Sequence, residues 1–99
     1  MNFALGKKVI VRTYAAGVWY GVLEDKNGSE VVLCEARRMW NWYTPKGISM
    51  SEVSKYGIVH KKSRICEPVD QIWLEAIEII PCTPEAIVSI EGAPYAEAQ

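Results

Sequence analysis

The chain has 99 residues, 49% of them hydrophobic and 23% charged, and a formal net charge of −1. This length fits a single domain with one modest core and leaves no room for a second domain. No apolar run approaches the ~20 residues that span a bilayer, and the N-terminal segment lacks a cleavage-site pattern. We therefore expect a cytoplasmic protein without a membrane partner.

Three strands are predicted in the first half of the chain. The β-branched run over 8–13 predicts the first strand, and a turn at 14–17 leads into a second strand over 18–24. Gly21 in its centre indicates a bulge or a sharp bend. Asn27-Gly28 is the strongest hairpin signal, because both residues tolerate positive φ. The third strand then begins at Glu30 and extends as far as Trp42.

A short helix is predicted after this three-stranded region. Ser49 and Glu52 have the spacing of a capping box, and Gly57 is placed to end a helix of about two turns. The following segment, 60–64, is polar and basic. It predicts an irregular connection.

Two more strands and a second helix are predicted toward the C-terminus. A strand begins at 65–66, and a longer one covers 71–80, where the apolar positions change parity near Ala76 and imply a bulge. Thr83 as N-cap and Pro84 at the first helical position predict a helix over 84–91 that stops at Gly92.

These elements predict a mainly-β fold with minor α structure. We expect a strongly bent, five-stranded antiparallel SH3-like or Sm-like barrel with one short inserted helix and a C-terminal helix, since curling removes the exposed edges of a small sheet. The domain is expected to cover residues 1–92, with 93–99 as a flexible tail.

The net charge hides a strong asymmetry along the chain. All 11 Lys and Arg lie between Lys7 and Arg64 with 5 acidic residues, a net of +6, whereas the part from Ile65 onward has 7 acids and no base, a net of −7. This split predicts a basic face for an anionic ligand, or complementary faces that meet between subunits. Acidic strands beside basic strands within one subunit are a third interpretation. The sequence leaves all three open.

The residue pattern predicts neither a metal site nor catalysis. Cys34, Cys66 and Cys82 are widely spaced, and His60 is distant from each of them in sequence, so no metal and no cofactor are expected. The sequence has no P-loop, no GxSxG and no HExxH motif, and we expect a protein that is not an enzyme.

Residues 36–43 combine basic and aromatic side chains and form the candidate ligand site. Arg37 and Arg38 are suited to phosphate, and Trp40 and Trp42 to stacking on a base. In a regular strand, Arg38, Trp40 and Trp42 would share one face. Packing of the same side chains in the core, or in a subunit interface, explains the pattern equally well.

The first turn supplies three further candidate ligand residues. Arg12, Tyr14 and Trp19 flank this turn, which lies near one mouth of a small barrel, a usual place for a ligand. The basic cluster 61–64 is a further candidate for phosphate contacts, although such clusters are usually solvated loops.

Two resemblances to known families accompany these patterns. Residues 6–33 resemble the first half of an Sm-like or SH3-type barrel through Val9-x-Val11, Gly17-x-x-x-Gly21-x-Leu23 and Glu30-Val31-Val32-Leu33. Over residues 6–94 the chain resembles an uncharacterised family of small proteins frequent in tailed-phage genomes. The segments that carry this second resemblance are 12–18, 28–33, 36–42 and 77–83. It implies a phage origin and supplies no activity.

Three functions follow as expectations. The first is a phage accessory protein that counters a host defence in the host cytoplasm, by sequestering a nucleotide-type immune signal in a homo-oligomer. The second is an Sm-like module that binds RNA or DNA, for which the slightly acidic net charge is unfavourable. The third is a protein-interaction or assembly module that inhibits a host protein.

Overall fold

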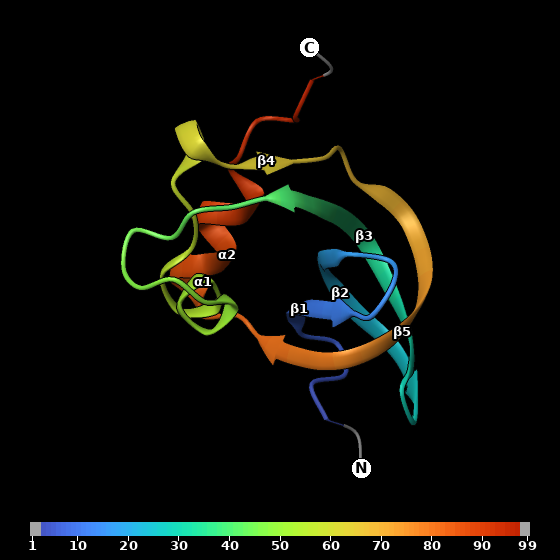
Figure 1. Cartoon of the computed structure of the whole chain (residues 1–99). Coiled ribbons are helices and arrows are strands. Elements are labelled where there is room, and N and C mark those ends of the chain that lie inside the picture. Colours follow the sequence, from blue (N-terminus) through green and yellow to red (C-terminus); the bar gives the residue numbers. More distant parts are fainter. Residues whose placement is uncertain (1–2, 98–99) are drawn as a thin grey trace.

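The computed structural model describes residues 3–97, and within them five strands form one antiparallel sheet accompanied by two α-helices and a short 3₁₀ helix. Figure 1 shows both α-helices on the same side of the strands. The predicted mainly-β class is confirmed. The elements, in chain order, are β1 (Lys8–Thr13), β2 (Val18–Asn27), β3 (Glu30–Asn41), α1 (Met50–Tyr56), η1 (His60–Lys62), β4 (Arg64–Ile65), β5 (Val69–Pro81) and α2 (Pro84–Glu91).

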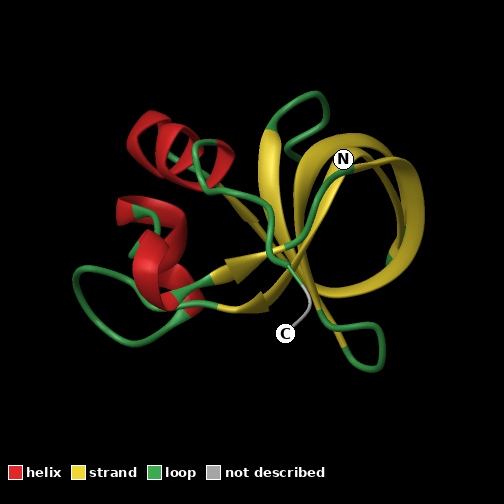
Figure 2. Ribbon diagram, turned by 90° about the horizontal axis from the view of Figure 1, so that it is seen from above, coloured by secondary structure: helices red, strands yellow, loops and turns green. Residues whose placement is uncertain are grey.

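The sheet bends so strongly that β2, at one end of the strand order, also pairs with β3 near the other end. Its strand order is β2-β1-β5-β3-β4, and β2 pairs with β3 in addition to β1, so the pairings of these four strands return to their starting point. Figure 2 shows the strands curling round one another, with the helices to one side. The finer likeness to an SH3-like or Sm-like barrel stays a prediction.

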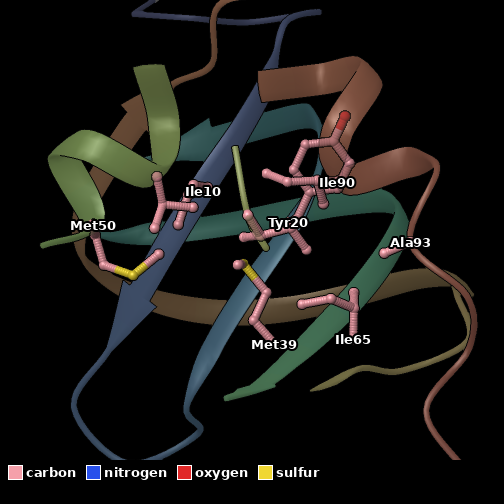
Figure 3. Close-up of a cluster of buried hydrophobic side chains, with 9 residues drawn as sticks. Ile10, Tyr20, Met39, Met50, Ile65, Ile90 and Ala93 are labelled. Atoms are coloured by element: carbon pink, nitrogen blue, oxygen red, sulfur yellow. The ribbon is translucent and has the colours of Figure 1, made fainter. Parts of the chain in front are cut away.

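The hydrophobic core consists of two clusters that share β1. Val9 and Val11 face a cluster made of strand residues, whereas Ile10 between them faces a second cluster that joins the strands to the helices (Figure 3). These three residues have no exposed surface, so β1 is buried on both faces. The cluster shared with the helices, called the helix-side cluster below, consists of Ile10, Tyr20, Met39, Met50, Val53, Ile58, Ile65, Ile90 and Ala93.

The β2–β3 hairpin turns one residue later than the sequence predicts. Asn27 pairs with Glu30, so the two central turn residues are Gly28 and Ser29 instead of Asn27 and Gly28. Only Gly28 of these has positive φ, at 62°. Glycine at the first central position satisfies a two-residue hairpin turn without requiring positive φ at the second, so Asn27 is free to remain in the strand.

The two bulges predicted from the sequence, at Gly21 and near Ala76, occur as register shifts between paired strands. Tyr20 pairs with Arg37 and Val22 with Cys34, so two residues of β3 lie opposite Gly21. A Cβ atom at Gly21 would lie 2.8 Å from the Cys34 carbonyl oxygen, which explains why glycine is needed there. In β5 the register with β1 shifts between Ala76 and Glu78, next to the predicted bulge.

Both predicted helices begin and end at their signal residues. The Glu52 carboxylate accepts hydrogen bonds from the Ser49 backbone N–H and hydroxyl group, and α1 ends before Gly57, whose φ is 82°. Thr83 Oγ1 accepts a hydrogen bond from the Ala86 N–H at the start of α2. Within residues 3–97 no helix is both long and apolar enough to cross a membrane.

The segment after α2, where we expected a tail, pairs with β4. Ala93 is 6% exposed, Tyr95 forms a parallel bridge with Ile65, and the Ala96 N–H donates to the Ile65 carbonyl over 2.8 Å. The chain therefore continues along the edge of the sheet through Ala96. Positions 98–99 lie outside the described residues.

Candidate functional site

Arg37, one of the predicted ligand residues, is buried and forms hydrogen bonds within the protein. Its side chain is 5% exposed, and burial lowers its pKa. Its three guanidinium nitrogens donate to the backbone carbonyls of Cys66 at 2.8 Å, Ile90 at 2.9 Å and Ile65 at 3.2 Å. The same group stacks 5.1 Å from the ring centroid of Tyr95. Arg37 thus joins β3 to β4, α2 and the C-terminal segment, and its charge is directed into the protein.

Arg38 and Trp19, predicted as separate ligand candidates, are brought together and hold the β1–β2 turn. The Arg38 guanidinium lies 4.4 Å from the centroid of the Trp19 ring. The Ala16 carbonyl accepts hydrogen bonds from Arg38 Nη1 at 3.3 Å and from Trp19 Nε1 at 3.0 Å. Trp19 is only 4% exposed, so its ring is not free to stack on a base.

Trp40 is the exposed member of the segment, and a β-bulge explains its exposure. Met39 pairs with Ile65 and Asn41 with Arg64, so Trp40 is the extra residue between consecutive pairs of β3 and β4. A bulge changes the direction of the side chain that it carries. The Trp40 side chain is 68% exposed.

The predicted common face of Arg38, Trp40 and Trp42 does not exist. Trp42 is half-buried against the helix-side cluster, to which buried Met39 belongs, whereas Arg38 lies on Trp19. The regular alternation on which that prediction depended is interrupted at Trp40.

Arg12 and Tyr14 have different surroundings from one another. Arg12 Nη1 forms an ion pair with Glu78 Oε1 at 3.0 Å. Tyr14 is 93% exposed and lines a groove with Trp73 of β5. The predicted ligand residues therefore do not form one site. Arg37 is buried, Arg38 and Trp19 stabilise the β1–β2 turn, and Tyr14 and Trp40 are exposed.

Folding joins the exposed end of the aromatic segment to the basic cluster at 61–64. The Tyr43 N–H donates to Ser63 Oγ at 3.0 Å, and Lys62 Nζ lies 5.9 Å from the centroid of the Tyr43 ring. Arg64 is paired with Asn41, next to the bulge. Tyr43 itself is 58% exposed. We call Trp40, Tyr43, Lys62 and Arg64 the aromatic–basic surface.

Positive charge is concentrated in the part of the sequence that contains Tyr43, Lys62 and Arg64. Residues 43–64 contain five Lys or Arg and one acid, Glu52, a net of +4. Glu52 is occupied in capping α1, and hydrogen bonds from Ser49 and Ile48 lower its pKa. The two ion pairs among the described residues, Lys8–Glu91 and Arg12–Glu78, involve none of these bases. Both pairs join the basic part of the sequence to the acidic part, so some of the charge split is neutralised within one subunit.

β5 carries exposed apolar residues that were not predicted from the sequence. Trp73 is 55% exposed and Ile77 is 59% exposed, and with Tyr14 they line a groove of about 470 Å³. The period-2 pattern of β5 contained the signal, because buried Leu74 places Trp73 on the opposite face. The apolar positions of β5 were used only to predict a strand and its bulge, and the opposite face with Trp73 was not considered.

In the part of the chain that the structure describes, no group of three or more His, Cys, Asp and Glu is arranged to hold a metal ion. Cys82 is half-buried, and this partial burial raises the pKa of its thiol to about 12, so the thiol is protonated at neutral pH. His60 Nε2 lies 2.7 Å from the Ser89 carbonyl oxygen, a geometry in which that nitrogen carries the proton. The Cys82 thiol and the His60 ring thus have surroundings typical of structural residues.

The fold and this surface define a small mainly-β domain with an open aromatic and basic face. The chain belongs to a family described as a domain of unknown function (DUF6948), which matches residues 6–90. This agrees with the predicted resemblance to an uncharacterised family, whereas its phage origin stays a prediction. No curated protein and no solved structure matches the chain.

Proposed function

We propose that this protein is a non-enzymatic binding domain for ligands that join aromatic bases to phosphate, and that its ligand is a short single strand of RNA or DNA. The observation that supports this most is the 68% exposure of Trp40 at a bulge beside Arg64. Exposed indole and phenol rings next to cations that belong to no ion pair among the described residues are the combination that binds single strands without an enclosing pocket. The Arg64 guanidinium donates to the Glu97 carbonyl at 2.9 Å, a neutral acceptor that does not compensate its charge.

The energetics of such a surface are adequate for binding. Stacking of a base on an aromatic ring contributes ~1–3 kcal/mol, and Trp40 and Tyr43 supply two such rings. Lys62 and Arg64 add phosphate contacts whose strength falls as salt rises. The surface is open, which favours an extended strand over a small nucleotide, because small ligands are usually bound in concave sites.

A nucleotide-type immune signal would use the same chemistry and is the second candidate. Sequestration of such a signal by a phage accessory protein is supported by the sequence resemblance to phage proteins. Self-association is a further prediction of this candidate, because two copies facing each other would enclose a small ligand between their aromatic rings. Light scattering tests it: a mass of 11.1 kDa would show a monomer and leave the small ligand without an enclosed site.

The test is a titration of labelled single-stranded ten-nucleotide DNA and RNA, in parallel with cyclic dinucleotides, followed by fluorescence anisotropy and calorimetry. Trp40→Ala and Tyr43→Ala should each weaken oligonucleotide binding by about fivefold to a hundredfold, the equivalent of one lost stacking contact. Lys62→Gln should weaken binding and reduce the slope of log affinity against log salt by about one.

Lys7→Gln is the matched control, because it makes the same charge change before β1 at an exposed residue outside this surface. It should leave oligonucleotide affinity unchanged within about twofold. If no oligonucleotide binds more tightly than about 100 µM at low salt, which is the weak end of non-specific binding, the proposal is wrong. Tight binding of a cyclic dinucleotide alone would favour the second candidate.

A further inference from the structure

β5 changes its pairing partner halfway along its length. Residues 76–81 pair with β1, from Thr13↔Ala76 onward, whereas residues 69–75 pair with β3, from Glu30↔Glu75 onward. On the side away from β3, residues 69–75 therefore have no strand partner among the described residues. An open strand edge is a template for pairing with another chain.

The backbone groups at this edge are directed outward. The Ala76 N–H donates to the Ser29 carbonyl at 2.8 Å, on the side of β3. Because N–H groups alternate in direction along a strand, those of Gln71, Trp73 and Glu75 point away from β3. The open edge thus presents three amide donors in one row.

Exposed apolar side chains accompany this edge. Val69 is 43% exposed, Trp73 is 55% exposed and Ile77 is 59% exposed, and all three alternate with inward residues such as buried Leu74. The groove of about 470 Å³ beside Trp73 also contains Tyr14 of the β1–β2 turn. Glu75 lies on the same face as Trp73, and the hydrocarbon stems of Lys or Arg side chains of an added strand would be covered there.

The charge around the edge is negative. Glu75 pairs directly with Glu30 in the sheet, and Asp70 is exposed near the start of β5. None of the three carboxylates belongs to an ion pair among the described residues. Nearby, Lys26 donates to the Gly28 carbonyl at 2.8 Å and lies beside Asp25. Like charges opposite each other destabilise a pair of strands, so a partner with cations is favoured.

A second copy of this chain is a poorer occupant of the same edge. Pairing of two β5 edges across a twofold axis would place Asp70 and Glu75 of both copies along one seam, and β5 supplies no basic residue to it. These carboxylates would add to the like-charge repulsion already present between Glu30 and Glu75.

We propose that the β5 edge over residues 69–75 binds an extended segment of a partner protein, in which Lys or Arg alternates with apolar residues, as an added β-strand. Backbone hydrogen bonds supply affinity in this mode of recognition, and alternate side chains supply specificity. This surface is separate from the aromatic–basic surface, and the inference does not depend on nucleic-acid binding.

The probe is a capped seven-residue peptide of alternating Lys and Val, titrated into the ¹⁵N-labelled full chain. We expect saturable binding tighter than about 1 mM, which corresponds to about −4 kcal/mol, with the largest amide shifts at Gln71, Trp73 and Glu75. The same peptide with N-methylated amides on its pairing edge should bind at least about tenfold more weakly. A peptide of alternating Glu and Val should not bind.

Two substitutions separate this proposal from a general attraction to cations. Trp73→Ala should weaken peptide binding about tenfold, and Glu75→Gln about threefold to fivefold. Glu85→Gln, which removes the same charge at the start of α2, should have no effect. Equal binding of the N-methylated peptide, or amide shifts centred on Trp40 and Lys62 instead of β5, would overturn the inference.

Discussion

The basic beginning and the aromatic end of the segment 37–43 have different places in the molecule. Arg37 is buried and donates to three carbonyls, while Arg38 supports a turn by stacking on Trp19. Trp40 and Tyr43, a few residues later, are mostly exposed beside Lys62. The comparison shows that arginine and aromatic side chains close together in sequence can be either tied into the fold or exposed. A single extra residue in β3 separates the two groups.

The strongest way to sharpen this comparison is to truncate one tryptophan in each setting, Trp19 beneath Arg38 and the exposed Trp40. Trp19→Ala removes a ring that is 4% exposed, and it should lower the free energy of unfolding by about 3–5 kcal/mol. Trp40→Ala, at 68% exposure, should change it by less than about 0.5 kcal/mol. Urea unfolding measures both. Similar losses would mean that Trp40 packs against the protein.

The second prediction concerns the buried guanidinium. Arg37→Met should cost about 2–4 kcal/mol of stability, because the carbonyls of Ile65, Cys66 and Ile90 lose their donor. Lys62→Met is the control at an exposed position and should cost less than about 0.5 kcal/mol. A neutral Arg37→Met variant would show that Arg37 does not tie β3 to α2.

At the bulge opposite Gly21, two substitutions should change the free energy of unfolding in opposite directions. Gly21→Ala should destabilise the protein by about 1–3 kcal/mol, because its Cβ would lie 2.8 Å from the Cys34 carbonyl oxygen. Glu35→Gly should be neutral or stabilise by up to about 1 kcal/mol, since Glu35 has a φ of 50° that glycine adopts without strain. Chemical denaturation of the two variants decides. The same sign for both would contradict this account of the bulge.

The smallest expected effect is a pH dependence at the end of α2. Glu91 accepts a hydrogen bond from the Tyr20 hydroxyl at 2.6 Å and pairs with Lys8 at 2.6 Å. Burial raises the pKa of Glu91, but the hydrogen bonds from Lys8 and Tyr20 together outweigh burial and leave the pKa below its usual value. A carboxyl whose pKa is lowered by folding stabilises the protein above its unfolded pKa of about 4.3.

That stabilisation should be lost as the pH falls from about 5 through the folded pKa of Glu91. Because the Glu91 side chain is 43% exposed, solvent screening limits the effect to less than about 1 kcal/mol. Melting temperatures across this pH range, compared with those of Glu91→Gln, measure the difference. The variant should show a flatter acid limb, and parallel curves would remove Glu91 as a contributor.

Local signals predicted most elements of the fold. Ser49, Glu52 and Gly57 predicted α1 because caps depend on neighbours within one turn, and Thr83 with Pro84 predicted α2 in the same way. The hairpin was predicted one residue too early, because the choice between Asn27 and Gly28 as the first central residue depends on the pairing of the whole hairpin.

The candidate site was predictable in composition and not in geometry. The sequence identified residues 36–43 and the cluster 61–64 separately, and only the β3–β4 pairing places Arg64 beside Asn41. The exposed stripe of β5 with Trp73 went unnoticed, because an aromatic residue in a strand is most often part of the core.

By itself the sequence determined the mainly-β class, the two helices with their caps, and the division of charge along the chain, because these depend on residues close to one another. Only the tertiary structure decided which arginines and tryptophans face outward. The direction of a side chain in a strand follows from the register with distant partners, and one bulge at Trp40 reverses it for every residue that follows.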